Sequence, residues 1–163
     1  MFRSQALNPD IQRLDALDSG EPSMDTWLSE HASGAEARRV ARTFVWTTED
    51  QTVKGYYSLT GHRIVRDELP KPVGRGPSEV PAVLLARLAL DRSLHGQALG
   101  GVLLADALER IVVATQTVAA RIVVVDALHE RAATFYEHYG FTRIPGNLRL
   151  VQKVSDVAAA LKP

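Results

Sequence analysis

Apolar and polar stretches alternate in the second half of the chain in an order that predicts strand, helix and strand. An almost uninterrupted apolar run over 82–90 ends at Asp91 and is typical of a central strand buried on both faces. Apolar positions then recur at helical spacing from about Ala98 to Thr115. Residues 120–128 repeat the pattern of a buried strand. This order predicts a β-α-β unit with parallel strands at the centre of a sheet.

Two helical stripes accompany these strands. The stripe of the first expected helix consists of Leu99, Val102, Leu103, Ile111 and Val112. The second helix, in the stretch "ERAATFYEHYGF", is stopped by Gly140, because glycine is the usual residue just past a helix end. Its spacing predicts that Phe135 and Tyr139 are core residues and that Tyr136 lies at the edge of their stripe. At that edge, the Tyr136 hydroxyl is either satisfied by packing or free to reach a cleft.

Patterns on both sides of this unit predict antiparallel strands. Thr43–Thr47 and Val53–Leu59 flank the turn "TEDQ" as a hairpin, preceded by short helical pieces that start near Ser23. The segments "FTRIP" and "LRLVQKV" predict a closing strand pair around "PGN". Residues 67–81 hold four of the eight prolines and are expected to form a loop or linker. The predicted fold class is α/β, with a mixed sheet and flanking helices in a single domain over 1–163.

Composition narrows the function classes. The chain has 163 residues, 45% of them hydrophobic, which is enough for one buried core. Its 19 basic and 19 acidic side chains cancel, so binding to nucleic acid or membranes by bulk charge is not expected. The basic residues are 15 Arg and 4 Lys. Arginine suits phosphate and carboxylate groups, although a GC-rich genome gives the same bias.

Cysteine, metal and membrane chemistry are also limited by the sequence. No cysteine is present, which excludes disulfides, thiolate nucleophiles and Cys-based zinc sites. His62 and His95 have no partners at metal-ligand spacing, so no metal is expected. No stretch reaches transmembrane length and the first residues contain no apolar leader region, so no membrane partner and a cytoplasmic location are expected.

Three glycines between the central strand and the next helix predict a phosphate-binding loop or, equally, a tight turn. Gly96, Gly100 and Gly101 leave backbone N–H groups open beside the positive end of the helix dipole. The P-loop motif is absent, because no lysine occurs in 72–152. The dinucleotide motif is also absent, because Gly96 and Gly100 are four residues apart. A different strand–loop–helix cradle for phosphate remains.

Together, "VPAVLLARLALD", "HGQALGG" and "FYEHYGF" resemble the GNAT superfamily of acetyl-CoA-dependent N-acetyltransferases. The resemblance implies the GNAT fold, with a splayed central strand and a loop that holds the pyrophosphate of acetyl-CoA. Two loop positions depart from the superfamily pattern: His95 stands where Arg or Gln is usual, and Ala98 where the first glycine is usual. The residues implied in cofactor binding are Leu88, Ala89, Leu90, His95, Gly96, Gln97, Ala98, Leu99, Gly100 and Gly101.

A longer series of segments narrows the resemblance to the GNAT toxins of bacterial type II toxin–antitoxin pairs. These segments are "MDTWLSEHASGAEARRVARTFVW", "VKGYYSLTGHRI", "VPAVLLARLALDRSLHGQALGGVLLADAL" and "ERAATFYEHYGF". The resemblance implies acetylation of the α-amine of aminoacyl-tRNA, a block of translation, a ribbon–helix–helix antitoxin as partner, and a homodimer.

Within this resemblance Tyr136 matches the catalytic tyrosine. A phenol with a pKa of about 10 is neutral at pH 7 and donates a proton or a hydrogen bond to a departing coenzyme A thiolate, whose thiol has a pKa of about 8.5. Backbone N–H groups around Leu88–Leu90 are the candidates for the thioester oxygen. An aminoacyl α-amine titrates at or below the pKa of about 7.7–8.0 of a free terminus, so much of it is already neutral at pH 7 and no strong protein base is required. His129 and Glu130 are expected to cap the helix of Tyr136.

The tRNA side is expected to use a local arginine patch, because phosphates are held by such patches even on a neutral protein. For part of that patch, "EARR", an ordinary solvated helix face is the competing interpretation. The candidates are Arg38, Arg39, Arg42 and Arg92, with Arg63, Arg66 and Arg75 in the middle stretch.

Two other functions remain open from the sequence. The first is a GNAT enzyme for a small amine or a protein N-terminus, although no carboxylate cluster marks an acceptor site for a small amine. The second is a GNAT-like binding module without catalysis, which the departures at His95 and Ala98 support and Tyr136 argues against. Toxicity on expression separates the toxin from both, and acetyl-CoA turnover separates the enzymes from the module.

Overall fold

The computed structural model describes residues 2–70 and 78–162, and these fall into two compact units. The first unit comprises Met1–Thr60 and Ala86–Ala107, and the second comprises Gly61–Leu85 and Leu108–Pro163. Strands β3 and β4 and helix α3 each have one part in either unit. The single domain over 1–163 stays a prediction.

The first unit contains the predicted hairpin. Strand β2 (Arg42–Thr47) pairs antiparallel with β3 (Val53–Val65), as the alternating pattern predicts. A short strand that the sequence did not predict, β1 (Ser4–Ala6), adds to the outer edge of β2. The strand order in this unit is β1-β2-β3-β4.

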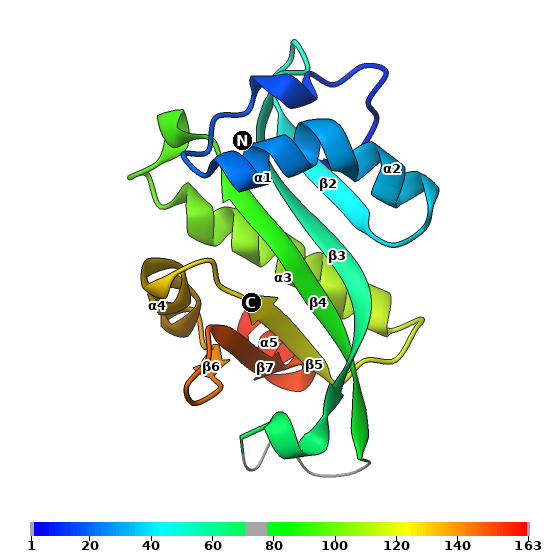
Figure 1. Ribbon diagram of the computed structural model, residues 1–163, viewed down its shortest axis with the longest axis vertical. Coiled ribbons are helices and arrows are strands. Elements are labelled where there is room, and N and C mark those ends of the chain that lie inside the picture. The colour runs from blue at the N-terminus through cyan, green and yellow to red at the C-terminus, as the bar shows by residue number, and fades with distance from the viewer. Residues whose placement is uncertain (1, 71–77, 163) are drawn as a thin grey trace. The chain divides into compact units, whose positions relative to one another are not determined.

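A continuous helical segment covers this unit's apolar core. It consists of α1 (Pro22–Thr26), the π-helical turn η2 (Trp27–His31) and α2 (Ala32–Ala37), and it begins where the sequence predicts (Figure 1). The turns η1 (Leu14–Ala16) and η4 (Arg92–Leu94) belong to the same unit. The buried core cluster consists of Leu17, Met24, Leu28, Ala32, Val45, Val53, Tyr56 and Ala89.

The second unit contains the predicted parallel pair. Strand β4 (Glu79–Leu90) pairs parallel with β5 (Ile122–Asp126), and β7 (Arg149–Lys153) pairs antiparallel with β5 and with the short β6 (Thr142–Arg143). The strand order here is β4-β5-β7-β6, so the sheet is mixed, as predicted. The core cluster consists of Ile64, Leu69, Val80, Ala82, Ile122, Val124, Ile144 and Val151.

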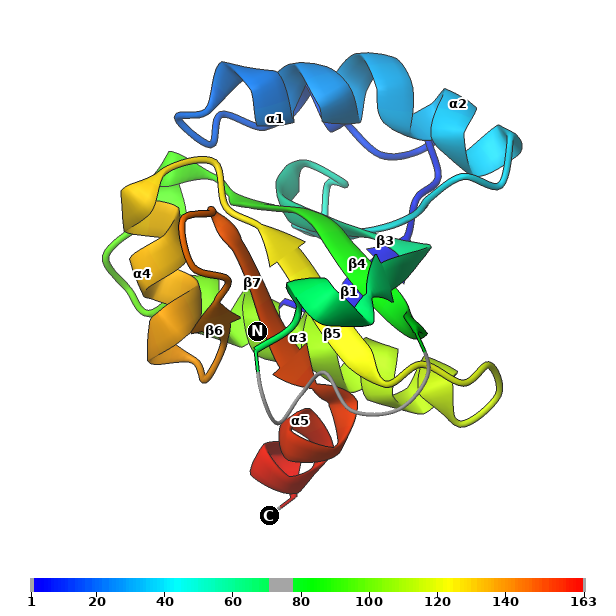
Figure 2. The same cartoon turned by 60° about the horizontal axis from the view of Figure 1, so that its bottom comes forward.

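The remaining helices sit around these strands. Helix α3 (Leu99–Thr115) is the predicted crossover between β4 and β5. Helix α4 (Glu130–His138) lies beside β6 and β7 in Figures 1 and 2, and α5 (Val154–Leu161), which the sequence did not predict, packs on β7. A 3-10 turn, η3 (Arg66–Glu68), follows β3.

The burial of several side chains differs from the prediction. Tyr136 is buried at 8% exposure, whereas Tyr139 is 39% exposed and Phe135 is half-buried, so the predicted core face of α4 was wrong. Tyr139 is the C-cap of α4, where the helix ends just before Gly140 at φ +95°, whereas the Tyr136 ring packs against Phe141. In α3, Val102 is likewise exposed, whereas the neighbouring Leu103 and Leu104 are buried.

Two further strand and loop predictions need correction. Strand β4 begins at Glu79, so the predicted loop over 67–81 is shorter at its end, and residues 71–77 lie outside the described residues. Buried and half-buried positions intermix along β4, so it is not buried on both faces throughout. The apolar run in the sequence is uninterrupted because apolar residues also occupy the half-buried positions of β4.

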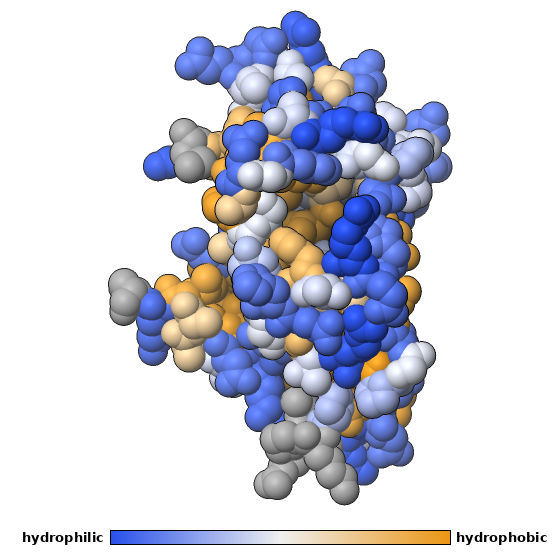
Figure 3. All heavy atoms as spheres, turned by 90° about the vertical axis from the view of Figure 1, so that its left-hand side faces the viewer, coloured by the Kyte–Doolittle hydropathy of each residue, from blue (hydrophilic) through white to orange (hydrophobic). Residues whose placement is uncertain are grey.

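The surface is rich in hydrophilic side chains. On the face shown in Figure 3 these surround smaller hydrophobic areas, as expected of a chain in which 23% of residues are charged. Within the described part of the chain, no helix is both long and apolar enough to cross a membrane.

Candidate active site

The predicted phosphate loop starts at a buried carboxylate, Asp91, which follows β4 directly. Its oxygens accept hydrogen bonds from the backbone N–H of Asp18 at 3.0 Å and of Ser93 at 3.0 Å, and from Ser93 Oγ at 2.7 Å. Burial alone raises the pKa of Asp91, but these hydrogen bonds and the charge of Lys54 outweigh it, and the net pKa lies below the usual value. Asp91 is therefore an ionised anchor that fixes where the loop leaves the strand.

The loop itself is held by hydrogen bonds from its own side chains to nearby backbone oxygens. Nε2 of His95 lies 2.7 Å from the carbonyl oxygen of Leu90, and because a carbonyl only accepts, the ring donates. Gln97 Nε2 donates to the backbone oxygen of Ser93 at 3.2 Å. His95 and Gln97 thus hold the loop's path, and their contact with the cofactor stays a prediction.

Left-handed backbone conformations shape the centre of the loop. Gly96 has φ +79°, and a Cβ added there would meet no atom within 4 Å. Ala98, where the superfamily pattern has glycine, has φ +60°, which costs an alanine backbone strain. The loop thus keeps a glycine-like path at Ala98 despite the extra methyl group.

Helix α3 begins immediately after this turn. Leu99 is its first residue, and Gly100 and Gly101 lie in its first turn, where backbone N–H groups have no partner within the helix. Side chains are absent from both glycines, so an anion can approach these N–H groups closely. The residues that would hold the phosphates of acetyl-CoA therefore fit such a group in backbone conformation, with open space at Gly96.

Tyr136 is fixed by aromatic packing on α4. Its ring makes edge contacts with Phe135 at 5.2 Å and Phe141 at 5.7 Å between ring centroids. Among the described residues, none forms a hydrogen bond to its hydroxyl. Burial raises the pKa of Tyr136 above its usual value, so the phenol stays protonated at neutral pH and has a donor to offer.

The two ends of α4 are fixed by different groups. Nδ1 of His129 accepts the N–H of Ala132 at 3.2 Å and caps the helix, as predicted. Glu130 forms no such cap; instead it binds Arg143 at 2.6 Å, as Glu137 does at 3.0 Å. These ion pairs hold α4 against β6, which begins one residue before Arg143.

The predicted tRNA-binding arginines are engaged in part by surface carboxylates. Arg42 binds Glu36, and Arg92 binds Asp18 at 2.9 Å. Arg38 closes α2 and is followed by Arg39 in a left-handed conformation, with φ +60°. Both are exposed. Of the others, Arg63 lies in β3 and Arg66 in η3, and Arg75 lies outside the described residues.

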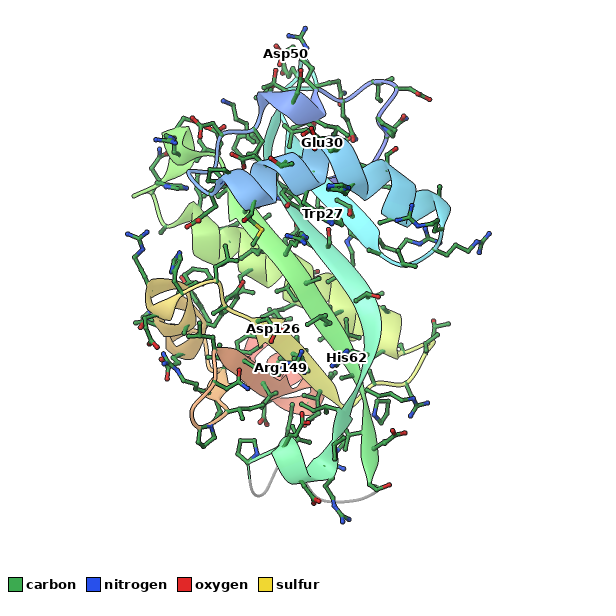
Figure 4. The ribbon with its side chains drawn as sticks, in the orientation of Figure 1. Trp27, Glu30, Asp50, His62, Asp126 and Arg149 are labelled. Carbon is green, nitrogen blue, oxygen red and sulfur yellow. The ribbon has the colours of Figure 1, made fainter. Side chains whose placement is uncertain are left out.

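Two arrangements were missed by the sequence reasoning. In the first unit, the guanidinium of Arg87 lies 4.7 Å from the ring centroid of Trp27. In the second, Arg149 binds Asp126 through two hydrogen bonds, at 2.7 and 2.9 Å, and its Nη1 lies 3.3 Å from Nε2 of His62 (Figure 4). Neither has a local signal, because the partners are 23 to 87 residues apart in the chain.

Within the described residues, no group of three or more histidines, aspartates or glutamates could hold a metal ion.

Comparison with known proteins gives relatives over most of the chain. A tRNA-acetylating toxin of Mycobacterium tuberculosis is 36% identical over 154 residues, which cover 93% of this chain and 92% of that protein. No family model matches the chain. The predicted fold class is confirmed by the solved structures below.

Two solved structures of the toxin AtaT are similar in fold. The complex of AtaT with acetyl-methionyl-tRNAfMet is 28% identical, with a TM-score of 0.89, over 99% of this chain and 100% of that one. A tyrosine-to-phenylalanine mutant of AtaT, bound to the C-terminus of the antitoxin AtaR and to acetyl-CoA, is 27% identical, with a TM-score of 0.84, over 99% of both chains.

Proposed function

This chain belongs to the tRNA-acetylating toxins, and from that membership we propose that it transfers the acetyl group of acetyl-CoA to the α-amine of aminoacyl-tRNA and so blocks translation. The observation that carries the proposal is 36% identity to such a toxin over 93% of the chain. The AtaT complexes with acetyl-methionyl-tRNA and with acetyl-CoA support the same substrate pair.

Acetyl-CoA supplies an activated acetyl thioester, and the loop after β4 is proposed to hold it. Backbone N–H groups of Gly96 to Gly101 would donate hydrogen bonds to its phosphate oxygens. Asp91 and His95 fix the path of the loop that carries these groups. Backbone N–H groups of Leu88, Ala89 and Leu90 would donate to the thioester oxygen as negative charge develops there.

Tyr136 is proposed to stabilise the departing sulfur. When the amine nitrogen forms its bond to the carbonyl carbon, the carbon–sulfur bond breaks and the sulfur takes the electron pair. The pKa of a tyrosine already lies above that of a thiol and burial raises that of Tyr136 further, so the phenol keeps its proton and acts by donating a hydrogen bond. The amine proton leaves to water, since an aminoacyl α-amine requires no strong base near neutral pH.

Partners and location follow from this activity. We propose that an antitoxin binds this chain, because AtaT is bound to the C-terminus of its antitoxin AtaR. The ribbon–helix–helix class of that antitoxin and a homodimer of the toxin stay predictions. The cytoplasm is the proposed location, because charged tRNA is used there.

Cell-free translation tests the proposed function against its alternatives. Purified protein should inhibit translation only when acetyl-CoA is present, and charged tRNA added after the protein has been removed should restore it. An enzyme for small amines or protein N-termini would consume acetyl-CoA without this inhibition. A binding module would not consume acetyl-CoA, and either of these two outcomes would overturn the proposal.

A further inference from the structure

Arg87 is a half-buried cation held by an aromatic ring and a sulfur atom. Its guanidinium carbon lies 4.7 Å from the centroid of the Trp27 ring, and Nη1 lies 3.9 Å from Sδ of Met24. Among the described residues, no carboxylate lies within ion-pair distance of Arg87. The thioether of Met24 is a weak hydrogen-bond acceptor, and the Trp27 ring interacts with the face of the guanidinium rather than with its N–H groups. Guanidinium N–H donors therefore remain available.

The support beneath Arg87 is rigid. The Trp27 ring stacks on Tyr56 with a centroid distance of 6.1 Å and an interplanar angle of 8°. Tyr56 is completely buried, and its hydroxyl donates to the backbone oxygen of Met24 at 2.7 Å. Figure 4 shows Trp27 pointing from the helical segment towards the strands. We call Arg87, Trp27, Tyr56 and Met24 the Arg87 stack.

Comparison with other arginines shows what is unusual about this position. Arg42 and Arg92 lie at the surface and are neutralised by Glu36 and Asp18. Arg87 is more buried yet has no anionic partner in the described chain, and burying a charge without one is unfavourable. A preorganised, planar set of donors without a protein partner suits an anionic ligand, above all a phosphate.

The strand position indicates which substrate brings that phosphate. Arg87 precedes Leu88–Leu90 on β4, the backbone proposed to hold the thioester. Because side chains alternate along a strand, Arg87 lies on the same face as Ala89, which packs in one cluster with Met24 and Tyr56. When the amine of the acetyl acceptor reaches the backbone of Leu88–Leu90, the charged groups of the acceptor that lie nearest to its amine come close to Arg87.

We infer that Arg87, supported by Trp27, binds a phosphate in the 3′-terminal single-stranded end of tRNA. This inference rests on the proposed function and adds to it a specific contact on the acceptor side. The guanidinium would donate to phosphate oxygens while its face stays on the Trp27 ring.

Binding of deacylated tRNA at several salt concentrations tests the inference without requiring catalysis. Arg87→Met should raise the Kd about tenfold and lower the slope of log Kd against log salt by about 0.7, the value for one phosphate contact on a single strand. Arg87→Lys should keep the slope and lose part of the affinity, because it retains the charge without the planar stack. Trp27→Leu should weaken binding more than Trp27→Phe, which keeps an aromatic face.

Arg13→Met is the matched control, because Arg13 is an exposed arginine of the same unit and loses the same charge. It should leave the slope unchanged, and the Kd for acetyl-CoA should stay unchanged in all variants. The inference is overturned if folded Arg87→Met has the wild-type slope, if Arg13→Met lowers it equally, or if the loss falls on acetyl-CoA instead. If Arg87→Met fails to fold, Arg87→Gln is measured in its place. A wild-type salt slope in folded Arg87→Gln would overturn the inference in the same way.

The two proposals fail in different ways. A wild-type protein that binds tRNA with this salt dependence but acetylates none contradicts the proposed function alone. A wild-type protein that acetylates charged tRNA, with an unchanged KM in Arg87→Met, contradicts the Arg87 contact alone.

Discussion

The loop from Asp91 to Gly101 and the helix that carries Tyr136 are built in opposite ways. In the loop, hydrogen bonds and left-handed backbone conformations set the path, and few side chains pack. In α4, rings set the position, because Phe135 and Phe141 both contact Tyr136 edge-on. The loop offers backbone N–H groups to a ligand, whereas the helix offers one hydroxyl.

This difference explains what each region tolerates. A loop specified by its φ angles keeps its shape when His95 and Ala98 replace the usual residues, provided that the backbone still turns left-handed. A single hydroxyl has no such redundancy, because the rings that pack on Tyr136, those of Phe135 and Phe141, carry no donor. We therefore expect substitutions in the loop to change acetyl-CoA affinity by degrees, and loss of the Tyr136 hydroxyl to change the rate sharply.

The largest effect is expected for Tyr136→Phe. Loss of the donor to the sulfur should lower kcat by about 10²- to 10⁴-fold, the usual range for a proton donor in catalysis. The melting temperature should hardly change, since among the described residues the hydroxyl has no hydrogen-bond partner to lose. Steady-state kinetics on charged tRNA measure the change.

Tyr139→Phe is the control for that variant, because Tyr139 lies on the same helix and is 39% exposed. It should retain the wild-type kcat. Equal losses in both variants would assign the effect to aromatic packing rather than to the hydroxyl.

The next effect concerns the loop backbone at Gly96. Gly96→Val forces a β-branched residue to φ +79°, a strain of about 1–3 kcal/mol, so the loop should relax to another path. The Kd for acetyl-CoA should rise about tenfold or more in calorimetry. Gly146→Val is matched, because Gly146 also has positive φ, +72°, with no atom within 4 Å of an added Cβ. If Gly146→Val weakens acetyl-CoA binding as much, the loop is not the binding element.

A smaller effect is expected when the anchor of the loop is made neutral. Asp91→Asn loses charge-assisted hydrogen bonds to Asp18 and Ser93, so stability should fall by about 1–3 kcal/mol and acetyl-CoA affinity several-fold. The folded-state pKa of Asp91 is lowered from its usual 3.8. The carboxylate therefore stabilises the fold above pH 3.8 and loses this contribution as the pH falls through the lowered pKa.

Urea unfolding from pH 7 down to about pH 2 measures this contribution of Asp91. The difference between wild type and Asp91→Asn should shrink at the acidic end. A difference that stays constant over this pH range would mean that the ionised form of Asp91 is not what anchors the loop.

The smallest effect is expected for Ala98→Gly. It relieves the left-handed strain at φ +60° and removes the methyl group beside the proposed phosphates, while the unfolded chain gains freedom. Relief of strain in the folded state and added freedom of the unfolded chain change the free energy of unfolding in opposite directions and nearly cancel. Acetyl-CoA should bind about twofold more tightly. Weaker binding in calorimetry would show that the methyl group itself contacts the cofactor.

The same two regions show how far the sequence leads. The apolar run before Asp91, the crossover helix and the hairpin were predictable, because each follows from local periodicity. The burial of Tyr136 and the exposure of Tyr139 were not, since they depend on where α4 meets its neighbours and where it ends. The ring of His95 was predicted to lie in the loop, but its bond to Leu90 required the turn to be known.

Arg87 shows the limit most clearly. Its place inside an apolar run gave no functional signal, and its partner Trp27 is 60 residues away in the chain. Only the fold brings these two side chains together.

Acetylation of aminoacyl-tRNA through Tyr136 can be tested directly. The most direct measurement incubates purified wild-type protein and Tyr136→Phe with acetyl-CoA and bulk charged tRNA, and then identifies the amino acids released from tRNA by mass spectrometry. We predict N-acetylated amino acids with the wild type and a sharp reduction with Tyr136→Phe. Wild-type protein that binds acetyl-CoA yet leaves every aminoacyl group unacetylated would contradict the account.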